Sequence, residues 1–231
     1  MSVLDLSTGE IEVIGLIQDA SNYTFLAELD LGANKILVIY KPRRGEAPLW
    51  DFPDGTLCLR EVAAYKVAQM MGWDFIPQSI IREGPMGLGL VQEFMEHDLS
   101  ATAFDLIDSH RLALKQMALF DIICNNADRK AGHVLLDPTS KIWGVDHGIC
   151  FHEVPKLRTV LWDFVGEPFE KDDIDAVAGL CARFDAEVVA GLRDLLSPAE
   201  IEAFRSRLSM VIGLGVYPAP SGGRAYPWPP I

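Results

Sequence analysis

Residues 125–136 read NNADRKAGHVLL and residues 144–148 read GVDHG. The first stretch joins an apolar, helix-like segment to a short apolar strand, and the second stretch ends another short strand. This pattern places two carboxylates, Asp128 and Asp146, at the ends of neighbouring elements. Three nitrogen-bearing side chains lie between them: Arg129, Lys130 and His133. Acids and cations gathered in this way are suited to holding phosphate groups and a metal ion.

The chain before this stretch has the residue pattern of a sheet. Three segments carry the β-branched and aromatic residues of strands: residues 10–17, 23–29 and 35–41. The polar residues 18–22 predict a hairpin loop between the first two. Pro42 cannot donate a hydrogen bond, so Lys41 is expected to be the last paired residue of the third strand. Its ammonium group then leaves a buried strand, and taken alone this position is better explained by an ordinary lysine that reaches solvent.

A helix follows these strands. Residues 58–71 have an apolar face and end at Gly72, which predicts a helix. Glu61 lies in its first half and is a candidate ion-pair partner for Lys41. The aromatic, turn-rich residues 50–55 before the helix predict an ordered loop, with a lid as one interpretation.

A second pair of strands closes the sheet. Residues 78–82 and 90–95 have strand patterns, and the glycine-rich residues 83–89 lie between them. Because these glycines lead into a strand and not into a helix N-terminus, they predict a hairpin turn and not a phosphate-binding loop.

Strand patterns give way to helix patterns near residue 96, which predicts a lobe boundary there. Four helices are expected after it: residues 110–125, capped by Asp108 and Ser109, then 172–184, 186–196 and 197–214. The last has Ser197, Pro198 and Glu200 in the order of a capping box. The expected division is a lobe at 1–96 with a hinge at 92–96, a helical lobe at 97–217, and a proline-rich, loosely held tail at 218–231 on which Tyr226 and Trp228 are candidates for docking.

Composition narrows the class of protein. The net charge of -13 opposes nucleic acid or an anionic membrane as the main partner, and 49% hydrophobic residues supply ample core. No apolar run approaches the ~20 residues needed to span a bilayer, so a cytoplasmic location is expected. The four cysteines, Cys58, Cys124, Cys150 and Cys181, have no CxxC spacing and are expected to be free thiols.

Together these residues suit phosphoryl transfer from ATP. A lysine on a buried strand can hold the α- and β-phosphates, and a glutamate on a helix can keep that lysine aimed. An aspartate at a strand end can carry Mg²⁺, which bridges phosphate oxygens. A second aspartate can orient or deprotonate an acceptor hydroxyl. The segment between the lobes offers backbone groups to an adenine edge.

Five short motifs resemble those of the phosphatidylinositol 3- and 4-kinase-like enzymes, whose plan the atypical kinases of the HipA and Fam20 types share. They are Lys41-Pro42, Arg60-Glu61, Gln92-Glu93-Phe94, Asp128-Arg129 followed by His133, and Val145-Asp146-His147-Gly148. Three longer segments are more closely similar to small actinobacterial proteins grouped with this superfamily under the SCO1664 name: residues 40–55, 125–130 and 157–162. The resemblance covers about residues 10–200. It implies an α+β, two-lobed, protein-kinase-like fold with a β-rich N-terminal lobe and a mostly helical C-terminal lobe.

The resemblance also implies roles at the matching positions. The ATP-binding residues are Lys41, its partner Glu61, and the adenine hinge of Gln92, Glu93, Phe94 and Met95. Asp128 resembles the catalytic aspartate, with Arg129 and Lys130 beside it. Asp146 and His133 are the implied ligands of Mg²⁺ or Mn²⁺. His133 stands where these kinases place an asparagine, and because imidazole suits Mg²⁺ less well than oxygen does, we expect a preference for Mn²⁺ or a single metal ion on Asp146.

The acceptor stays open at this point. A hydroxyl of a protein or of a small molecule is as plausible as an inositol lipid, because this compact acidic chain offers no surface for a membrane. Two alternatives to a kinase also stay open: an inactive nucleotide-binding pseudokinase that serves as an interaction module, and transfer of the nucleotidyl group from the same pocket. The presence of Asp128 favours an enzyme, because a module that only binds nucleotide has no need of it.

Overall fold

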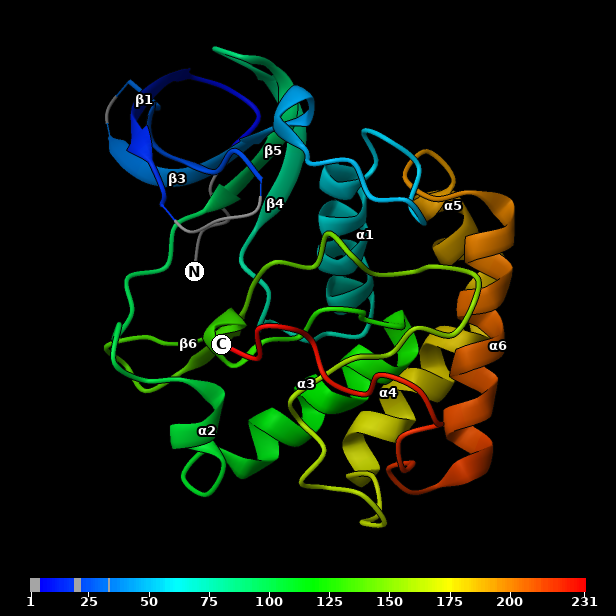
Figure 1. The fold of residues 1–231 in the computed structure, drawn as a ribbon. Helices are drawn as coiled ribbons and strands as arrows, with labels where there is room; N and C mark the ends of the chain where they lie inside the picture. The colour runs from blue at the N-terminus through cyan, green and yellow to red at the C-terminus, as the bar shows by residue number, and fades with distance from the viewer. Residues whose placement is uncertain (1–4, 19–21, 33) are drawn as a thin grey trace.

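A computed structural model of the chain describes residues 5–18, 22–32 and 34–231. Its N-terminal part is an antiparallel five-stranded sheet in the order β1-β2-β3-β5-β4. The strands are β1 (Glu10–Leu16), β2 (Phe25–Asp30), β3 (Lys35–Pro42), β4 (Ser79–Gly84) and β5 (Gly87–Glu93). Most of the helices follow in the C-terminal part, so the fold is kinase-like, with a β-sheet N-terminal region and a helical C-terminal region (Figure 1).

The five strands confirm the predicted strands, and their ends differ from the predicted ends by up to three residues. β3 continues to Pro42, which lies opposite Gly89 of β5, one residue beyond the expected end at Lys41. Proline lacks only the N–H donor, so a strand terminus tolerates it. The β4–β5 hairpin closes with Gly84 opposite Gly87 and confirms the predicted turn. The predicted loop at 18–22 falls partly on residues 19–21, outside the described residues.

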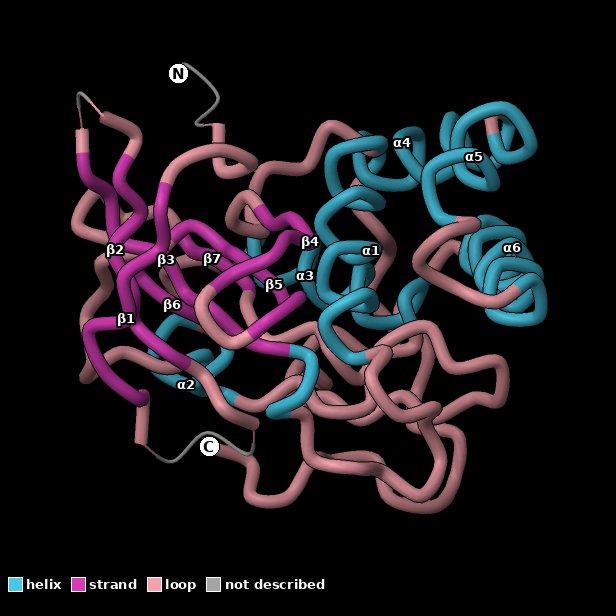
Figure 2. Tube along the Cα trace, turned by 90° about the horizontal axis from the view of Figure 1, so that it is seen from above, coloured by secondary structure: helices cyan, strands magenta, loops and turns pink. Residues whose placement is uncertain are grey.

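Helix α1 (Leu57–Met70) lies between the sheet and the helical region, as Figure 2 shows. Its N-terminus is capped from a distance. The Glu46 carboxylate accepts hydrogen bonds from the backbone N–H groups of Leu57 at 3.0 Å and Cys58 at 2.8 Å. A carboxylate at this end also complements the helix dipole. The cap therefore fixes α1 to the chain segment that follows β3.

Arg60 attaches α1 to the helical region. Its side chain is buried, and Nη1 donates to the Cys150 carbonyl at 2.8 Å. Nη2 forms an ion pair with Glu200, and the guanidinium lies 4.8 Å from the centre of the Phe52 ring. One side chain thus joins α1 to Cys150 and Glu200 of the helical region and holds the helix in place.

The helical region is built around α3, whose residues are mostly buried. Its elements are α2 (Ala103–Leu106), α3 (Arg111–Cys124), the hairpin strands β6 (Val134–Leu136) and β7 (Ile142–Gly144), α4 (Lys171–Ala182), α5 (Val189–Leu192) and α6 (Pro198–Leu214). The four cysteines are free thiols, as expected. Within the described part of the chain, no helix is long and apolar enough to cross a membrane.

Three helix predictions need correction. The short α2 was not predicted, and the N-cap of α3 is His110, not Asp108 or Ser109. The helix predicted at 186–196 is a π-helical turn at Phe184–Val188 followed by the four-residue α5. In α5 a Cβ on Gly191 would lie 2.4 Å from a methyl carbon of Met70, so glycine allows this segment to approach α1 closely.

The tail is docked, in contrast to the prediction of a loosely held segment. Main-chain carbonyls of Ala225 and Pro230 accept hydrogen bonds from the helical region. The aromatic rings expected to dock do not do so, because Tyr226 is 52% and Trp228 77% exposed. Backbone contacts and the buried Pro227, and not the two aromatic rings, therefore hold the tail.

The capping box of α6 is present as predicted and gives the first test. The Ser197 hydroxyl accepts from Glu200 N–H at 3.3 Å, and the Glu200 carboxylate accepts from Ser197 N–H at 2.8 Å. Because Ser197→Ala removes one of these bonds, we expect it to lower the free energy of unfolding by about 1 kcal/mol in urea titration. Ser206→Ala, on the exposed side of the same helix, is the control. Equal midpoints for the two variants would contradict the capping role.

Candidate active site

A cavity of about 400 Å³ lies between the sheet and the helical region, a size typical of small-ligand sites. Nine of the predicted site residues line it: Lys41, Gln92, Glu93, Phe94, Met95, Asp128, Lys130, His133 and Asp146. Glu61 and Arg129 are the two predicted residues that do not. The cavity therefore gathers residues from β3, β5 and the loops around β6 and β7.

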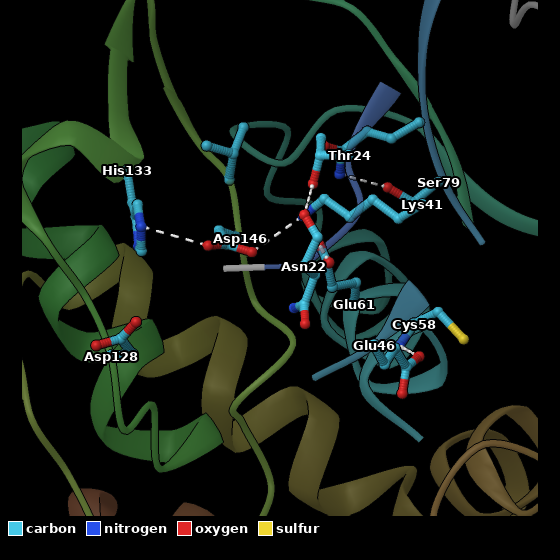
Figure 3. A network of polar contacts seen from close by, with 12 residues as sticks. Asn22, Thr24, Lys41, Glu46, Cys58, Glu61, Ser79, Asp128, His133 and Asp146 are labelled. Carbon is cyan, nitrogen blue, oxygen red and sulfur yellow. Dashed lines mark hydrogen bonds and ion pairs between the residues drawn. The ribbon is translucent and has the colours of Figure 1, made fainter. Parts of the chain in front are cut away.

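Lys41 is the centre of a three-residue ion-pair cluster. Its Nζ lies 2.7 Å from Glu61 Oε1 and 2.9 Å from Asp146 Oδ1 (Figure 3). Burial alone favours the neutral amine, but the charges of Asp146 and Glu61 raise the pKa of Lys41 above its ordinary value. One ammonium group thus holds together β3, α1 and the loop that follows β7.

The two carboxylates of this cluster have different environments. Glu61 is buried, burial raises its pKa, and its Oε2 has no hydrogen-bond partner among the described residues. The positive charge of Lys41 lowers the pKa of Asp146, whose side chain is 43% exposed. Asp146 also has φ of 59°, a left-handed conformation that a non-glycine residue adopts at a cost and that is enriched at functional sites. Asp146 therefore presents a charged carboxylate to the cavity.

His133 lies against the other oxygen of that carboxylate. Its Nε2 is 3.3 Å from Asp146 Oδ2, and its Nδ1 is the acceptor of the Lys130 backbone N–H at 3.4 Å. Burial lowers the pKa of His133 to about 4, so the ring is neutral near pH 7. With Nδ1 accepting, the ring proton is assigned to Nε2, which donates to Asp146.

Asp128 lines the same cavity from the loop before β6. The Asn126 side-chain oxygen accepts from the Asp128 backbone N–H at 3.0 Å, and Lys130 Nζ lies 3.7 Å from the Asp128 carboxylate. Burial raises the pKa of Asp128 to about 6, and the charge of Asp146 acts in the same direction. A carboxylate with this pKa is a stronger base than an ordinary aspartate and is still ionised at pH 7.

Arg129 points away from the cavity, although the resemblance placed it beside the catalytic aspartate. It is fully buried and forms a two-pronged ion pair with Asp121 of α3, through Nε at 3.1 Å and Nη2 at 3.0 Å. Its Nη1 donates to the carbonyls of Val145 at 3.1 Å and His133 at 3.3 Å. Arg129 therefore holds the loops of Asp128 and Asp146 in place, and its side chain does not line the cavity.

Asp121 and His147 complete this buried network, and neither was among the predicted site residues. His147 Nε2 lies 2.6 Å from Arg129 Nη2, and burial keeps the pKa of His147 well below its ordinary value, so the ring accepts this hydrogen bond. Asp121 also accepts from Asn126 at 2.9 Å and from the Thr159 hydroxyl at 3.1 Å. The available signal is a carboxylate within the otherwise apolar residues 117–124, because a buried charge requires a partner.

The predicted hinge reaches the cavity mainly through its backbone. The Gln92 side chain turns away and donates to Ser79 at 2.8 Å. Phe94 N–H donates to the Leu37 carbonyl at 3.2 Å, which keeps this segment attached to β3. The Met95 carbonyl lies 2.8 Å from His97 Nδ1. Residues 92–95 are therefore ordered against the sheet at the edge of the cavity.

Comparisons with known proteins identify the fold and the family. The crystal structure of a Helicobacter pylori proinflammatory kinase, CtkA, matches with a TM-score of 0.55 and 13% sequence identity, over 91% of this chain and 94% of that one. The fold is thus that of a kinase. The family description of phosphatidylinositol 3- and 4-kinases matches residues 63–199.

The chain belongs to the phosphatidylinositol 3- and 4-kinase family, because that match covers more than half of it. The matched region contains Asp128 and Asp146 but begins after Lys41 and Glu61. A curated relative, Protein Rv2133c of Mycobacterium tuberculosis, is 39% identical over 97% of this chain and 93% of its own length. This relative extends the similarity across nearly the whole molecule.

The buried pair of Arg129 and Asp121 gives the second test. Asp121→Asn leaves a buried guanidinium without its counter-charge, so we expect a loss of about 3 kcal/mol in the free energy of unfolding. Asp175→Asn breaks the exposed pair with Lys171 on α4 and is expected to leave the urea midpoint unchanged. A small loss from both variants would show that the buried network does not hold the site together.

Proposed function

We propose that this chain is an ATP-dependent phosphotransferase, an atypical kinase that moves the γ-phosphoryl group to a hydroxyl of another molecule. The observation that carries this proposal is the cluster of Lys41, Glu61 and Asp146 in a cavity that Asp128 also lines. The family and the fold support a kinase-like phosphotransferase. The acceptor and the individual roles below are part of the proposal.

The nucleotide would lie along the cavity with its base near the hinge. Four apolar side chains of the lining offer surfaces to an adenine ring: Ile17, Ile39, Leu135 and Val145. Backbone groups of residues 93–95 would pair with the edge of the base. Lys41 would hold the α- and β-phosphates, and Glu61 would keep its ammonium group aimed, as in other phosphoryl-transfer sites.

The residues around Asp146 fit a divalent cation. Its carboxylate oxygens have about four acceptor positions, of which Lys41 and His133 occupy two, and the side chain is exposed to the cavity. Among the described residues, no group of three or more His, Cys, Asp or Glu side chains is placed to hold a metal ion. Asp146 would therefore supply one protein ligand, and His133 would supply a second if its ring proton moves from Nε2 to Nδ1 and Nδ1 gives up its bond to Lys130 N–H, with phosphate and water oxygens as the rest. A bound Mg²⁺ or Mn²⁺ would offset charge on the phosphates.

Asp128 would act on the acceptor. In the transfer, the acceptor oxygen bonds to the γ-phosphorus as the bond to the leaving ADP breaks, and the hydroxyl proton passes to the Asp128 carboxylate. The raised pKa of Asp128 suits this step, because it brings the group closer to working pH. Arg129 positions this loop and is not a catalytic residue. Lys130, 3.7 Å from the Asp128 carboxylate, supplies positive charge near the reacting groups.

Nucleotide binding gives the third test. With ATP and metal ion at about 100 times their dissociation constant, the folded state gains about 2.7 kcal/mol, which should raise the melting temperature by about 5–10 °C. Asp146→Asn should remove most of the metal-dependent shift, whereas Asp108→Asn, exposed and outside the cavity, should keep it. Absence of any shift with ATP or GTP would contradict both the kinase and the pseudokinase interpretations.

The same thermal-shift measurement addresses the metal ion. If His133 is a ligand, the shift should be larger in Mn²⁺ than in Mg²⁺, and His133→Asn should reverse this order because an amide oxygen suits Mg²⁺ better. Equal shifts that do not respond to His133→Asn would leave Asp146 as the sole protein ligand and His133 as its hydrogen-bond donor.

The pH dependence of turnover gives the fourth test. The ionised form of Asp128 accepts the proton and prevails above a pKa of about 6, so kcat/KM should fall as pH decreases through this value. Asp128→Asn should lower kcat by about 100-fold or more while the nucleotide-dependent thermal shift is kept. Loss of the shift would instead indicate a binding role. ATP labelled at the γ- or α-position distinguishes phosphoryl from nucleotidyl transfer.

A further inference from the structure

The C-terminal segment returns to the loop that carries Asp128. In Figure 1 it leaves the end of α6 and crosses the helical region in red, and Pro230 near its end is bonded to Ala131 in the turn before β6. Three hydrogen bonds fix it: Thr159 N–H to the Ala225 carbonyl (3.1 Å), Trp162 Nε1–H to the same carbonyl (3.1 Å), and Ala131 N–H to the Pro230 carbonyl (2.8 Å). Residues 225–230 therefore pack against the segment that follows Asp128 and against residues 159–162.

The donors of these bonds belong to the framework of the active site. Ala131 is three residues after Asp128 in the same loop. Thr159 forms a parallel bridge with Arg129, in which Arg129 N–H donates to the Arg158 carbonyl at 3.0 Å and Val160 N–H donates to the Arg129 carbonyl at 3.1 Å. The loop of Asp128, residues 158–160 and the tail thus lie side by side in that order.

The tail also reaches Asp128 electrostatically. The positive charges of Lys130, Arg158 and Arg224 all act on the Asp128 carboxylate, and Arg224 belongs to the tail. This places the tail within range of the carboxylate that would receive the proton of the acceptor.

The tail is bound largely through its main chain, and Pro227 is its one buried residue between 224 and 230. All three donors contact main-chain carbonyls, and Tyr226 and Trp228 of the tail are largely exposed. Recognition of an extended chain through its backbone is tolerant of sequence, as in the addition of a strand to a sheet edge. A small polyol offers no row of carbonyl oxygens at this spacing.

We propose that the surface formed by Ala131, Thr159 and Trp162 is a docking site for an extended polypeptide, and that the acceptor is accordingly a protein hydroxyl. Residues 224–230 fill this site in cis, and an acceptor segment binds by displacing them. The choice of acceptor rests on the proposed phosphotransferase function. Docking of polypeptide at the surface requires no nucleotide and stands independently of that function.

A direct binding measurement tests the docking site. A fluorescent peptide of residues 218–231 is titrated into the full chain and into a chain that ends at Tyr217, whose buried ring and hydroxyl bond to Lys115 at 2.7 Å are retained. We expect binding to the shortened chain and at least about tenfold weaker binding to the full chain, whose site is already filled. Equal binding to both chains, or binding to neither, would overturn the proposal.

A matched pair of tryptophan variants identifies the surface. In the shortened chain, Trp162→Phe removes the indole donor but keeps an aromatic ring, so peptide affinity should fall about fivefold, the value of one neutral hydrogen bond. Trp50→Phe, at a ring that is 92% exposed and outside the site, should leave affinity unchanged. Equal affinities for both variants would show that the peptide binds elsewhere.

The full chain provides a test that does not depend on truncation. Trp162→Phe should speed amide hydrogen exchange at Ala131 and Thr159 by about tenfold at an unchanged melting temperature, because the tail leaves a surface that stays folded. A lower melting temperature with unchanged exchange would show that the tail is a fixed part of the core, and would overturn its displacement by an acceptor.

Turnover separates this inference from the proposed function. Dephosphorylated casein and myo-inositol are offered as acceptors to the full and shortened chains with labelled ATP. We expect transfer to casein, at least about fivefold faster by the shortened chain, and none to myo-inositol. Transfer to myo-inositol alone would overturn the protein acceptor. With no transfer to either, the phosphotransferase proposal fails, and the peptide measurements still decide whether the surface binds polypeptide.

Discussion

A buried ion pair between Arg129 and Asp121 is the constraint on which the candidate active site depends. Both side chains are fully removed from solvent. Removing either charge leaves the other without compensation in a low-dielectric interior, where such a loss is severe. The remaining donors of the guanidinium hold the carbonyl of Val145, next to Asp146 in the chain, and the carbonyl of His133. The loop of Asp128, the strand end of Asp146 and helix α3 are therefore constrained together.

The elements of the fold follow from local patterns wherever one face is buried. Strand content, the stop at Gly72 and the capping box at Ser197 were each readable because they act through neighbours in the chain. Local patterns do not predict the irregular structure found at residues 186–196, because the π-helical turn at Phe184–Val188 and the close approach of Gly191 to Met70 depend on tertiary contacts. The docking of the tail also differs from the prediction of a loosely held segment. Its proline content predicts irregular structure, but backbone carbonyls accept hydrogen bonds whatever the side chains are.

The site shows the same division between local and tertiary information. The meeting of Lys41, Glu61 and Asp146 was expected from the resemblance, since their order along the chain matches that of related kinases. The direction of the Arg129 side chain could not be expected from the sequence. Composition and spacing do not show whether a charged residue lines a cavity or is buried beneath it. The position of Asp121 did indicate a buried ion pair, because a carboxylate within an apolar run of a helix requires a partner when it is buried. The roles assigned to these residues remain proposals.

The bonds of Arg60 decide how the two halves of the molecule can move. Helix α1 lies in the chain between two strands of the sheet, yet Arg60 attaches it to Cys150 and Glu200 of the helical region. Because the Glu46 cap also ties α1 to the segment after β3, the helix is attached to both halves, and a movement of the sheet changes the distance between Lys41 of β3 and Asp146 of the helical region. The length of that one salt bridge then measures how far the molecule has opened. Exchange of a ligand in the cavity is then opposed by the same ion pair, because the cavity opens only as that pair lengthens.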